Sequence, residues 1–293
     1  MMTAASGRAG RSSLLDRLRY LLVLSRPRFW LYLAGPVIIG VVYAADSTAD
    51  LITPLSVALF AYFLVPANVF LYGVNDVFDA DIDTENPKKD EGPEVRFSGE
   101  RWVLAVVIGS GLLAVPFALV VGPAGKVTLG AFLVLAVEYS APPFRFKTTP
   151  GLDSLSNGLY VLPGVLAFTA VAGELPPTPA IVGGWLWTMA MHTFSAIPDI
   201  EPDRRAGIAT TATVLGQRRT YAYCGIVWAL AAGAFALIHP LLGATLAVYP
   251  LLQVGIAVSG VAVDRAYWWF PAINTVVGMV LTMGYLWRLM YGG

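Results

Sequence analysis

Residues 52–83 read ITPLSVALFAYFLVPANVFLYGVNDVFDADID, an apolar run that ends in four aspartates. Residues 52–74 carry no charged side chain and are long enough to cross a bilayer as a helix, which takes roughly 20 apolar residues. The aspartates follow directly at one end of that span. An apolar helix that ends in acidic groups predicts a membrane protein with a polar site at the membrane surface.

Composition supports a membrane protein. Over 293 residues, 57% are hydrophobic and 13% are charged, about half the charge of an ordinary soluble domain. The 29 glycines and 20 prolines are tolerated in membrane helices because neighbouring helices satisfy freed backbone groups. The formal net charge of zero predicts no nucleic-acid partner. Cys224 is the single cysteine, which excludes an intrachain disulfide and a cysteine-based zinc or iron–sulfur site.

The rest of the chain divides into similar apolar stretches. We expect an all-α membrane protein with nine transmembrane helices in one domain, residues 29–293, after a cytoplasmic segment, residues 1–28. Residues 14–24, LLDRLRYLLVL, suit an amphipathic helix on the membrane surface. The nine expected spans are about 29–46, 52–74, 101–121, 125–140, 154–172, 178–197, 220–238, 241–260 and 271–290.

Basic residues sort to one side of this arrangement. Only Lys126 and Arg288, of the 19 lysines and arginines, fall in loops or ends on the other side. The positive-inside rule therefore predicts a multi-pass protein of the cell membrane with its N-terminus and long loops in the cytoplasm and its C-terminus outside.

Two acidic clusters stand on the predicted cytoplasmic side. Asp76, Asp79 and Asp83 are spaced i, i+3 and i+7 with Asn75 beside them, and Asp199 and Asp203 are spaced i, i+4. Each set shares one helix face. Like charges so placed repel each other, so we expect a bound cation. Oxygen-only ligands favour Mg²⁺. A solvated acidic loop is the alternative, and we prefer it for a further set: Asp81, Glu85, Asp90, Glu91 and Glu94.

A basic segment ends the fourth expected span. Residues 138–147 read EYSAPPFRFK, and the two prolines favour an extended loop that holds Arg145 and Lys147 at the same membrane surface. Cations beside a carboxylate-bound Mg²⁺ suit a diphosphate. The alternative is that these two residues only determine topology. The clusters lie about 124 positions apart and each is followed by further spans, which suggests two four-helix halves facing one cavity.

These three motifs resemble those of the UbiA-type membrane prenyltransferases. Residues 75–83 match the family's NDxxDxxxD pattern, residues 199–203 its DxxxD pattern, and residues 139–147 resemble its YSxPPxRxK segment. The resemblance implies a UbiA-like prenyltransferase fold that takes an allylic diphosphate and Mg²⁺. The implied metal ligands are Asn75, Asp76, Asp79, Asp83, Asp199 and Asp203.

The resemblance also implies roles for individual side chains. Asp79, Asp83, Asp199 and Asp203 would be catalytic. Arg145, Lys147, Tyr139 and Arg28 would bind the diphosphate, with Arg26 as the alternative to Arg28. His192 is a candidate to point inward. Expected cavity-lining aromatic residues are Trp185, Trp187, Phe194, Tyr160, Phe70 and Tyr72.

Residues 139–160 and 197–216 resemble most the members that lengthen carotenoids. We therefore expect transfer from dimethylallyl diphosphate to lycopene, a hydrophobic polyene, giving C45 and C50 carotenoids, in association with other carotenoid-pathway enzymes. The balanced charge favours the actinobacterial type over archaeal types that couple transfer to hydration. Two alternatives remain: a prenyltransferase acting on an aromatic or quinone-precursor acceptor, and a membrane transporter for an anionic or metal-bound solute.

Overall fold

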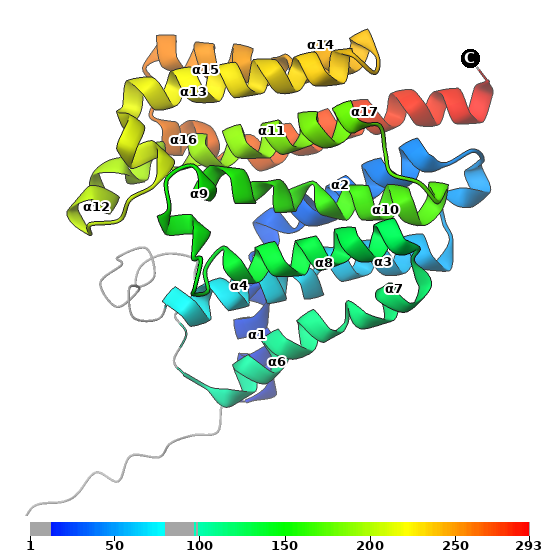
Figure 1. Cartoon of the computed structure of the whole chain (residues 1–293), viewed down its shortest axis with the longest axis horizontal. Helices are drawn as coiled ribbons and strands as arrows, with labels where there is room; N and C mark the ends of the chain where they lie inside the picture. Colours follow the sequence, from blue (N-terminus) through cyan, green and yellow to red (C-terminus); the bar gives the residue numbers. More distant parts are fainter. Residues whose placement is uncertain (1–12, 80–96, 98, 293) are drawn as a thin grey trace, which may run out of the picture.

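The computed structural model describes residues 13–79, 97 and 99–292, and within them the secondary structure is helical with no strand. The longer helices run side by side in Figure 1. The α-helices are α1 (Leu14–Leu24), α2 (Trp30–Ala44), α3 (Pro54–Leu64), α4 (Pro66–Asp79), α6 (Arg101–Leu112), α7 (Val115–Val120), α8 (Pro123–Glu138), α9 (Leu152–Leu155), α10 (Leu162–Ala172), α11 (Thr178–Ser195), α12 (Ile200–Arg205), α13 (Thr211–Ala236), α14 (Pro240–Leu246), α15 (Val248–Ser259), α16 (Val263–Tyr267) and α17 (Phe270–Tyr291).

Prolines set where many of these helices begin. Pro54, Pro123 and Pro240 each occupy the first turn, where the missing N–H removes no helical hydrogen bond and φ is already fixed. Pro66 divides one long apolar stretch into α3 and α4. A proline inside an apolar run can therefore divide one span into two consecutive helices without turning the chain back across the bilayer.

Six helical segments of the described chain are long and apolar enough to cross a membrane. Several apolar helices of this length are typical of a multi-pass membrane protein. The expected spans at 125–140, 178–197 and 220–238 correspond to α8, α11 and α13, which are not among the six. The count of nine spans therefore stays a prediction. The six are Pro27–Ala44, Pro54–Asp79, Arg101–Val120, Leu152–Ala172, Pro240–Ser259 and Phe270–Tyr291.

The buried apolar side chains form two clusters that follow each other in sequence. The first runs from Leu24 to Ala167 and the second from Ala190 to Val277. In Figure 1 the helices of the first cluster, among them α3, α4 and α8, lie below α13, α15 and α17 of the second. Two clusters in chain order are consistent with the expected two-half arrangement.

Small residues bring α2 and α10 into close contact. A Cβ added to Gly40 would lie 2.2 Å from the carbonyl oxygen of Gly164, and one added to Gly164 would lie 2.8 Å from that of Pro36. Close backbone approach at glycine is the usual way in which membrane helices associate. This contact joins the helix that follows the N-terminal segment to the helix that follows the basic loop.

The expected amphipathic helix is present as α1, with the predicted bounds. Ser13 caps it, and the Asp16 carboxylate accepts hydrogen bonds from Ser13, which lower the pKa of Asp16. Leu14, Leu18 and Leu22 are exposed and share one face. The helix therefore presents an apolar stripe outward from the protein.

Candidate active site

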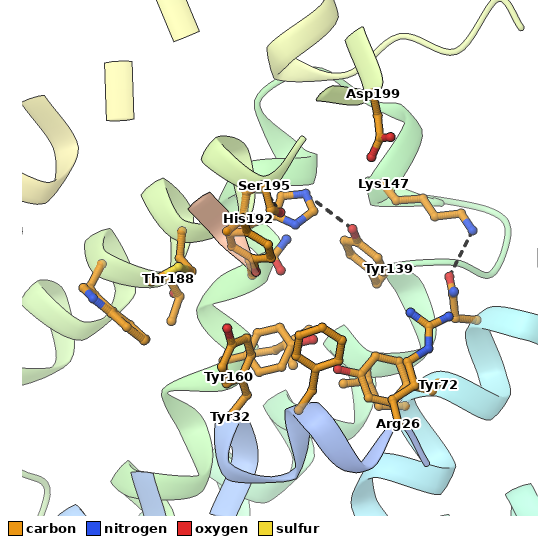
Figure 2. Close-up of a pocket in the computed structure, with 18 of the residues that line it drawn as sticks. Arg26, Tyr32, Tyr72, Tyr139, Lys147, Tyr160, Thr188, His192, Ser195 and Asp199 are labelled. Carbon is orange, nitrogen blue, oxygen red and sulfur yellow. Dashed lines mark hydrogen bonds between the residues drawn. The ribbon is translucent and has the colours of Figure 1, made fainter. Parts of the chain in front are cut away.

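One cavity of about 420 Å³ opens where the motif-bearing segments meet (Figure 2). In Figure 1, α4 ends and α12 begins at the same end of the bundle. Side chains from both halves of the chain line the cavity: Arg26, Phe29, Tyr32, Leu71, Tyr72, Asn75, Asp79, Tyr139, Lys147, Asn157, Leu159, Tyr160, Trp187, Thr188, Met191, His192, Ser195, Asp199 and Tyr267.

The last turn of α4 contributes the first acidic group. Asn75 and Asp79 lie one turn apart and both line the cavity. Asp76 faces elsewhere: it is 2% exposed, and its Oδ1 lies 3.5 Å from Nη2 of Arg26. Asp79 also sits at the C-terminal end of the helix, where the helix dipole is negative, so nearby cations are needed to stabilise it.

The basic loop supplies those cations. Lys147 pairs with Asp79, and its Nζ donates to Oδ1 of Asn75 at 3.2 Å. Arg145 Nη2 lies 3.1 Å from Asp79 Oδ1 and donates to the carbonyl of Phe78 at the same distance. The sequence prediction that both cations lie at the acidic mouth agrees with these contacts, although Arg145 itself does not line the cavity.

The loop has a defined backbone. The Pro142–Pro143 peptide is cis, and Arg145 has φ of 42°, a left-handed conformation that is unfavourable for a residue with a Cβ. The N–H of Lys147 donates to the carbonyl of Tyr139 at 3.0 Å, which closes the loop. The Ser140 hydroxyl donates to Asn75 Oδ1 at 2.8 Å. These contacts fix the loop against the end of α4.

The second acidic motif lies across a helix junction. Asp199 lines the cavity from the end of a 3-10 turn, Ile197–Asp199, whereas Asp203 belongs to α12 and does not line it. The structure thus separates two residues expected to share one helix face. Asp83, expected as both a metal ligand and a catalytic group, lies outside the described residues.

The donor set at the mouth fits a hard divalent cation. Asn75, Asp79 and Asp199 each offer a side-chain oxygen as a ligand, and the oxygens of Asn75 and Asp79 contact the positively charged Lys147. No cluster of three or more acidic, histidine or cysteine side chains forms among the described residues. The fit to Mg²⁺ rests on the three oxygen-bearing side chains, because Mg²⁺ typically takes one or two carboxylates and completes its shell with substrate phosphates and water.

Arg26, rather than Arg28, lines the cavity. The Arg28 guanidinium lies 3.4 Å from the ring centroid of Trp268 and donates to the Trp268 carbonyl, and Arg28 is absent from the lining. Arg26 lies 4.6 Å from the ring centroid of Tyr72. It has φ of 50° and precedes the 3-10 turn Pro27–Phe29, so the chain changes direction between the two arginines and they face different ways.

Of the aromatic residues expected to line the cavity, Tyr72, Tyr160 and Trp187 do so. The other three, Phe70, Trp185 and Phe194, do not: Phe70 and Phe194 lie in the apolar core, and the Trp185 ring packs against Gly158.

Nine lining residues were not expected from the sequence: Phe29, Tyr32, Leu71, Asn157, Leu159, Thr188, Met191, Ser195 and Tyr267. Tyr267 lies in the short helix α16, and burial raises the pKa of its phenol. Its place directly before the last apolar span is the one sequence signal that marks it as a residue of the membrane surface.

His192 points into the cavity. Its Nε2 lies 3.4 Å from the Tyr139 hydroxyl, and the two rings meet edge to face at 85°. Tyr139 therefore contacts the basic loop through its backbone and α11 through its side chain.

The helical fold and a cavity with acidic and basic side chains at its mouth are typical of a membrane-embedded enzyme. Residues 33–290 match the model of the UbiA prenyltransferase family, and the chain belongs to that family. It is a prenyltransferase.

Particular relatives sharpen this assignment. The chain is 66% identical over 277 residues to a lycopene elongase/hydratase of Haloferax volcanii, covering 94% of this chain and 92% of that protein. It is 30% identical over 229 residues to a lycopene elongase/hydratase of Corynebacterium glutamicum, covering 75% and 77%. The fold is similar to that of a UbiA homologue from Archaeoglobus fulgidus bound to DMAPP and Mg²⁺, with a TM-score of 0.72, 20% identity and coverage of 91% and 99%.

The expected closeness to the actinobacterial type was wrong. Identity with the archaeal protein is 66%, against 30% with the protein from Corynebacterium. The balanced charge was a poor guide because charge composition reflects mainly the surfaces that face water, whereas much of this chain's surface is apolar.

Proposed function

We propose that this prenyltransferase transfers the dimethylallyl group of dimethylallyl diphosphate to the ends of lycopene, giving C45 and C50 carotenoids. The observation that carries the proposal is the cavity's polarity: carboxylates and cations at the mouth lead into a wall of tyrosines. The 66% identity to an elongase/hydratase supports the acceptor, and the solved relative with DMAPP and Mg²⁺ supports the donor and metal.

The mouth would hold the donor's diphosphate. Asn75, Asp79 and Asp199 would carry the Mg²⁺, with Asp83 and Asp203 completing the acidic set and Asp76 holding Arg26 in place. When bound, Mg²⁺ would supply positive charge to the departing diphosphate. Lys147, Arg145 and Arg26 would stabilise the same developing charge, which lowers the barrier to breaking the carbon–oxygen bond.

The inner wall would then protect the allylic cation. Tyr72, Tyr160 and Trp187 line this wall, and the quadrupoles of aromatic rings attract a cation. Their bulk also limits access of water. A cavity of about 420 Å³ is within the range of small-molecule sites. It suits a five-carbon donor and one end of the acceptor, the remainder of which would lie in the bilayer.

Topology belongs to the same proposal. Nine spans, a single domain over residues 29–293 and 17 of 19 basic residues on one side would put the N-terminus and the active-site mouth in the cytoplasm and the C-terminus outside. Association with other carotenoid-pathway enzymes would bring lycopene to the cavity within the bilayer.

The test is direct. Purified protein in lipid vesicles, given lycopene, dimethylallyl diphosphate and Mg²⁺, is expected to yield C45 and C50 products by mass spectrometry, with or without an added hydroxyl group. Absence of both products would overturn the proposal. Product formation from an aromatic or quinone-precursor acceptor under the same conditions would favour that alternative.

A further inference from the structure

The face of α11 that lines the cavity carries one imidazole. Thr188, Met191, His192 and Ser195 are spaced i, i+3, i+4 and i+7, so they share one face, and all four line the cavity. His192 is the sole histidine among the described lining residues. An imidazole that faces a polar cavity from a largely apolar helix is unusual enough to call for a function.

The charged groups at the mouth are already engaged. Lys147 contacts Asp79 and Asn75, and Arg26 contacts Asp76. On the inner wall the remaining polar groups are largely hydroxyls, such as those of Tyr32 and Thr188, which are weak bases. An imidazole with an unprotonated nitrogen is the base that enzymes use most often.

His192 is also next to the place where the new bond would form. Tyr139 contacts Lys147 through its backbone and His192 through its hydroxyl, and Figure 2 shows Tyr139 between them. The reacting carbon of an allylic diphosphate is bonded directly to a diphosphate oxygen. A donor whose diphosphate is held at the mouth would therefore place that carbon in the same cavity that Tyr139 and His192 line.

We propose that His192 is the base that accepts the proton released when prenyl transfer is completed, an assignment that rests on the proposed function. The π electrons of the acceptor's terminal double bond form the new carbon–carbon bond, and the donor's carbon–oxygen bond breaks with its electron pair leaving on the diphosphate. The positive charge now lies on a tertiary carbon of the acceptor. His192 takes a proton from the adjacent carbon, and the carbon–hydrogen electron pair becomes the new double bond.

The same base serves a hydrating outcome. If water reaches the tertiary cation, an oxygen lone pair forms a carbon–oxygen bond, and His192 accepts the extra proton of that water. In both outcomes one proton passes to the imidazole and one diphosphate leaves. The choice between alkene and alcohol would then depend on whether water enters, while the base is shared.

Tyr139 positions the imidazole. The 3.4 Å separation of its hydroxyl from Nε2 is longer than a normal O–H···N hydrogen bond. Such a contact orients the ring while leaving Nε2 open to a closer proton donor. Removal of this hydroxyl should therefore have a smaller effect than removal of the imidazole.

The experiment compares two quantities in vesicles supplied with lycopene, dimethylallyl diphosphate and Mg²⁺: diphosphate released and elongated carotenoid formed. In His192→Asn and His192→Gln the product formed per diphosphate should fall by about 100-fold or more, while diphosphate release stays within about threefold. Without the base the tertiary cation reverts by breaking the new carbon–carbon bond, and water captures the allylic cation that is regenerated. Tyr139→Phe should lower the ratio by less than about tenfold. The matched control is Met189→Leu, a volume-conserving change on α11 outside the lining.

The outcomes separate the two proposals. Wild-type protein that makes no elongated product overturns the proposed function itself. An active wild type with an unchanged ratio in both His192 variants overturns the role of His192 alone. Loss of diphosphate release together with product, in a variant whose thermal unfolding midpoint matches wild type, also overturns it, because a terminal base acts after ionisation. If His192→Asn does not fold, His192→Gln decides.

Discussion

Thr211, the first residue of α13, donates both its backbone N–H and its hydroxyl to the buried carboxylate of Asp153 on α9. The N–H lies 2.9 Å from Oδ2, and the hydroxyl contacts Oδ1. The Gly151 N–H in turn donates to the Thr211 hydroxyl at 2.8 Å. Asp153 follows the loop that carries Lys147, and Thr211 follows the segment that carries Asp203. This contact therefore fastens the two motif-bearing loops together.

Asp153→Ala should destabilise the protein by about 2–3 kcal/mol, because it removes a helix cap and leaves two donors buried without an acceptor. Asp153→Asn keeps one acceptor oxygen and should cost less. Denaturant or thermal unfolding in detergent measures both. An Asp153→Ala variant as stable as wild type would show that the contact contributes nothing.

Asp79→Asn should reduce turnover by at least about 100-fold while the protein stays folded, because two cations lose their carboxylate and the metal loses a ligand. Asp203→Ala should also abolish turnover. The control is Glu201→Gln, an exposed side chain that pairs with Arg204 at the surface, which should change activity less than about twofold. Near-normal activity in Asp79→Asn would refute the assigned metal ligands. Titration with Mg²⁺ shows whether the defect is in metal binding.

Arg26→Met and Arg28→Met should differ in their effects on donor KM and on stability. Arg26 lines the cavity, so its loss should raise KM for the donor about tenfold or more. Arg28 stacks on Trp268, so its loss should leave donor KM within about twofold and lower stability by about 1 kcal/mol. Steady-state kinetics with varied donor concentration distinguishes the two variants. A larger rise in KM for Arg28→Met than for Arg26→Met would support Arg28, the residue chosen from the sequence.

Gly40→Ala should destabilise the contact between α2 and α10, because the added methyl group would meet the Gly164 carbonyl at 2.2 Å. We expect a loss of about 2 kcal/mol or more. Gly35→Ala on the same helix has nothing within 4 Å of the new Cβ and should be neutral or stabilising by up to about 1 kcal/mol. Thermal midpoints of the purified variants compare them directly, and equal midpoints would argue against close packing at Gly40.

Thiol labelling should report the orientation. The one natural cysteine, Cys224, is buried, so wild-type protein should resist a membrane-impermeant thiol reagent. Lys126 and Arg205 are both exposed. Lys126→Cys should react in intact cells, whereas Arg205→Cys should react only after the membrane is opened. Labelling of both from outside would contradict the predicted topology.

Local periodicity allowed part of the site to be predicted. The i, i+4 spacing of Asn75 and Asp79 put both on one face of α4, and both line the cavity. The basic loop was also predicted, because prolines that break a helix beside Arg145 and Lys147 leave these cations at the helix end. Helical class and membrane insertion followed from composition alone.

The other site residues could not be predicted, because their positions depend on how the helices are rotated and where they break. Trp185 and Trp187 are two positions apart on α11 and face different partners: Trp187 lines the cavity, and Trp185 hydrogen-bonds to the Leu155 carbonyl. For a helix that is apolar on every side, composition does not predict which face turns toward the cavity. Arg26 and Arg28 flank the start of a 3-10 turn, so helical spacing could not choose between them. Asp199 and Asp203 straddle a similar junction.

The order of the two apolar clusters along the chain has a consequence for biogenesis. Residues of the first cluster, up to Ala167, leave the ribosome before those of the second, which begin at Ala190. The first half can therefore bury its own core while the second is still being synthesised. The cavity needs Trp187, His192 and Tyr267 from later segments. A nascent chain thus has the acidic end of α4 well before the wall that shields a reactive cation from water is complete.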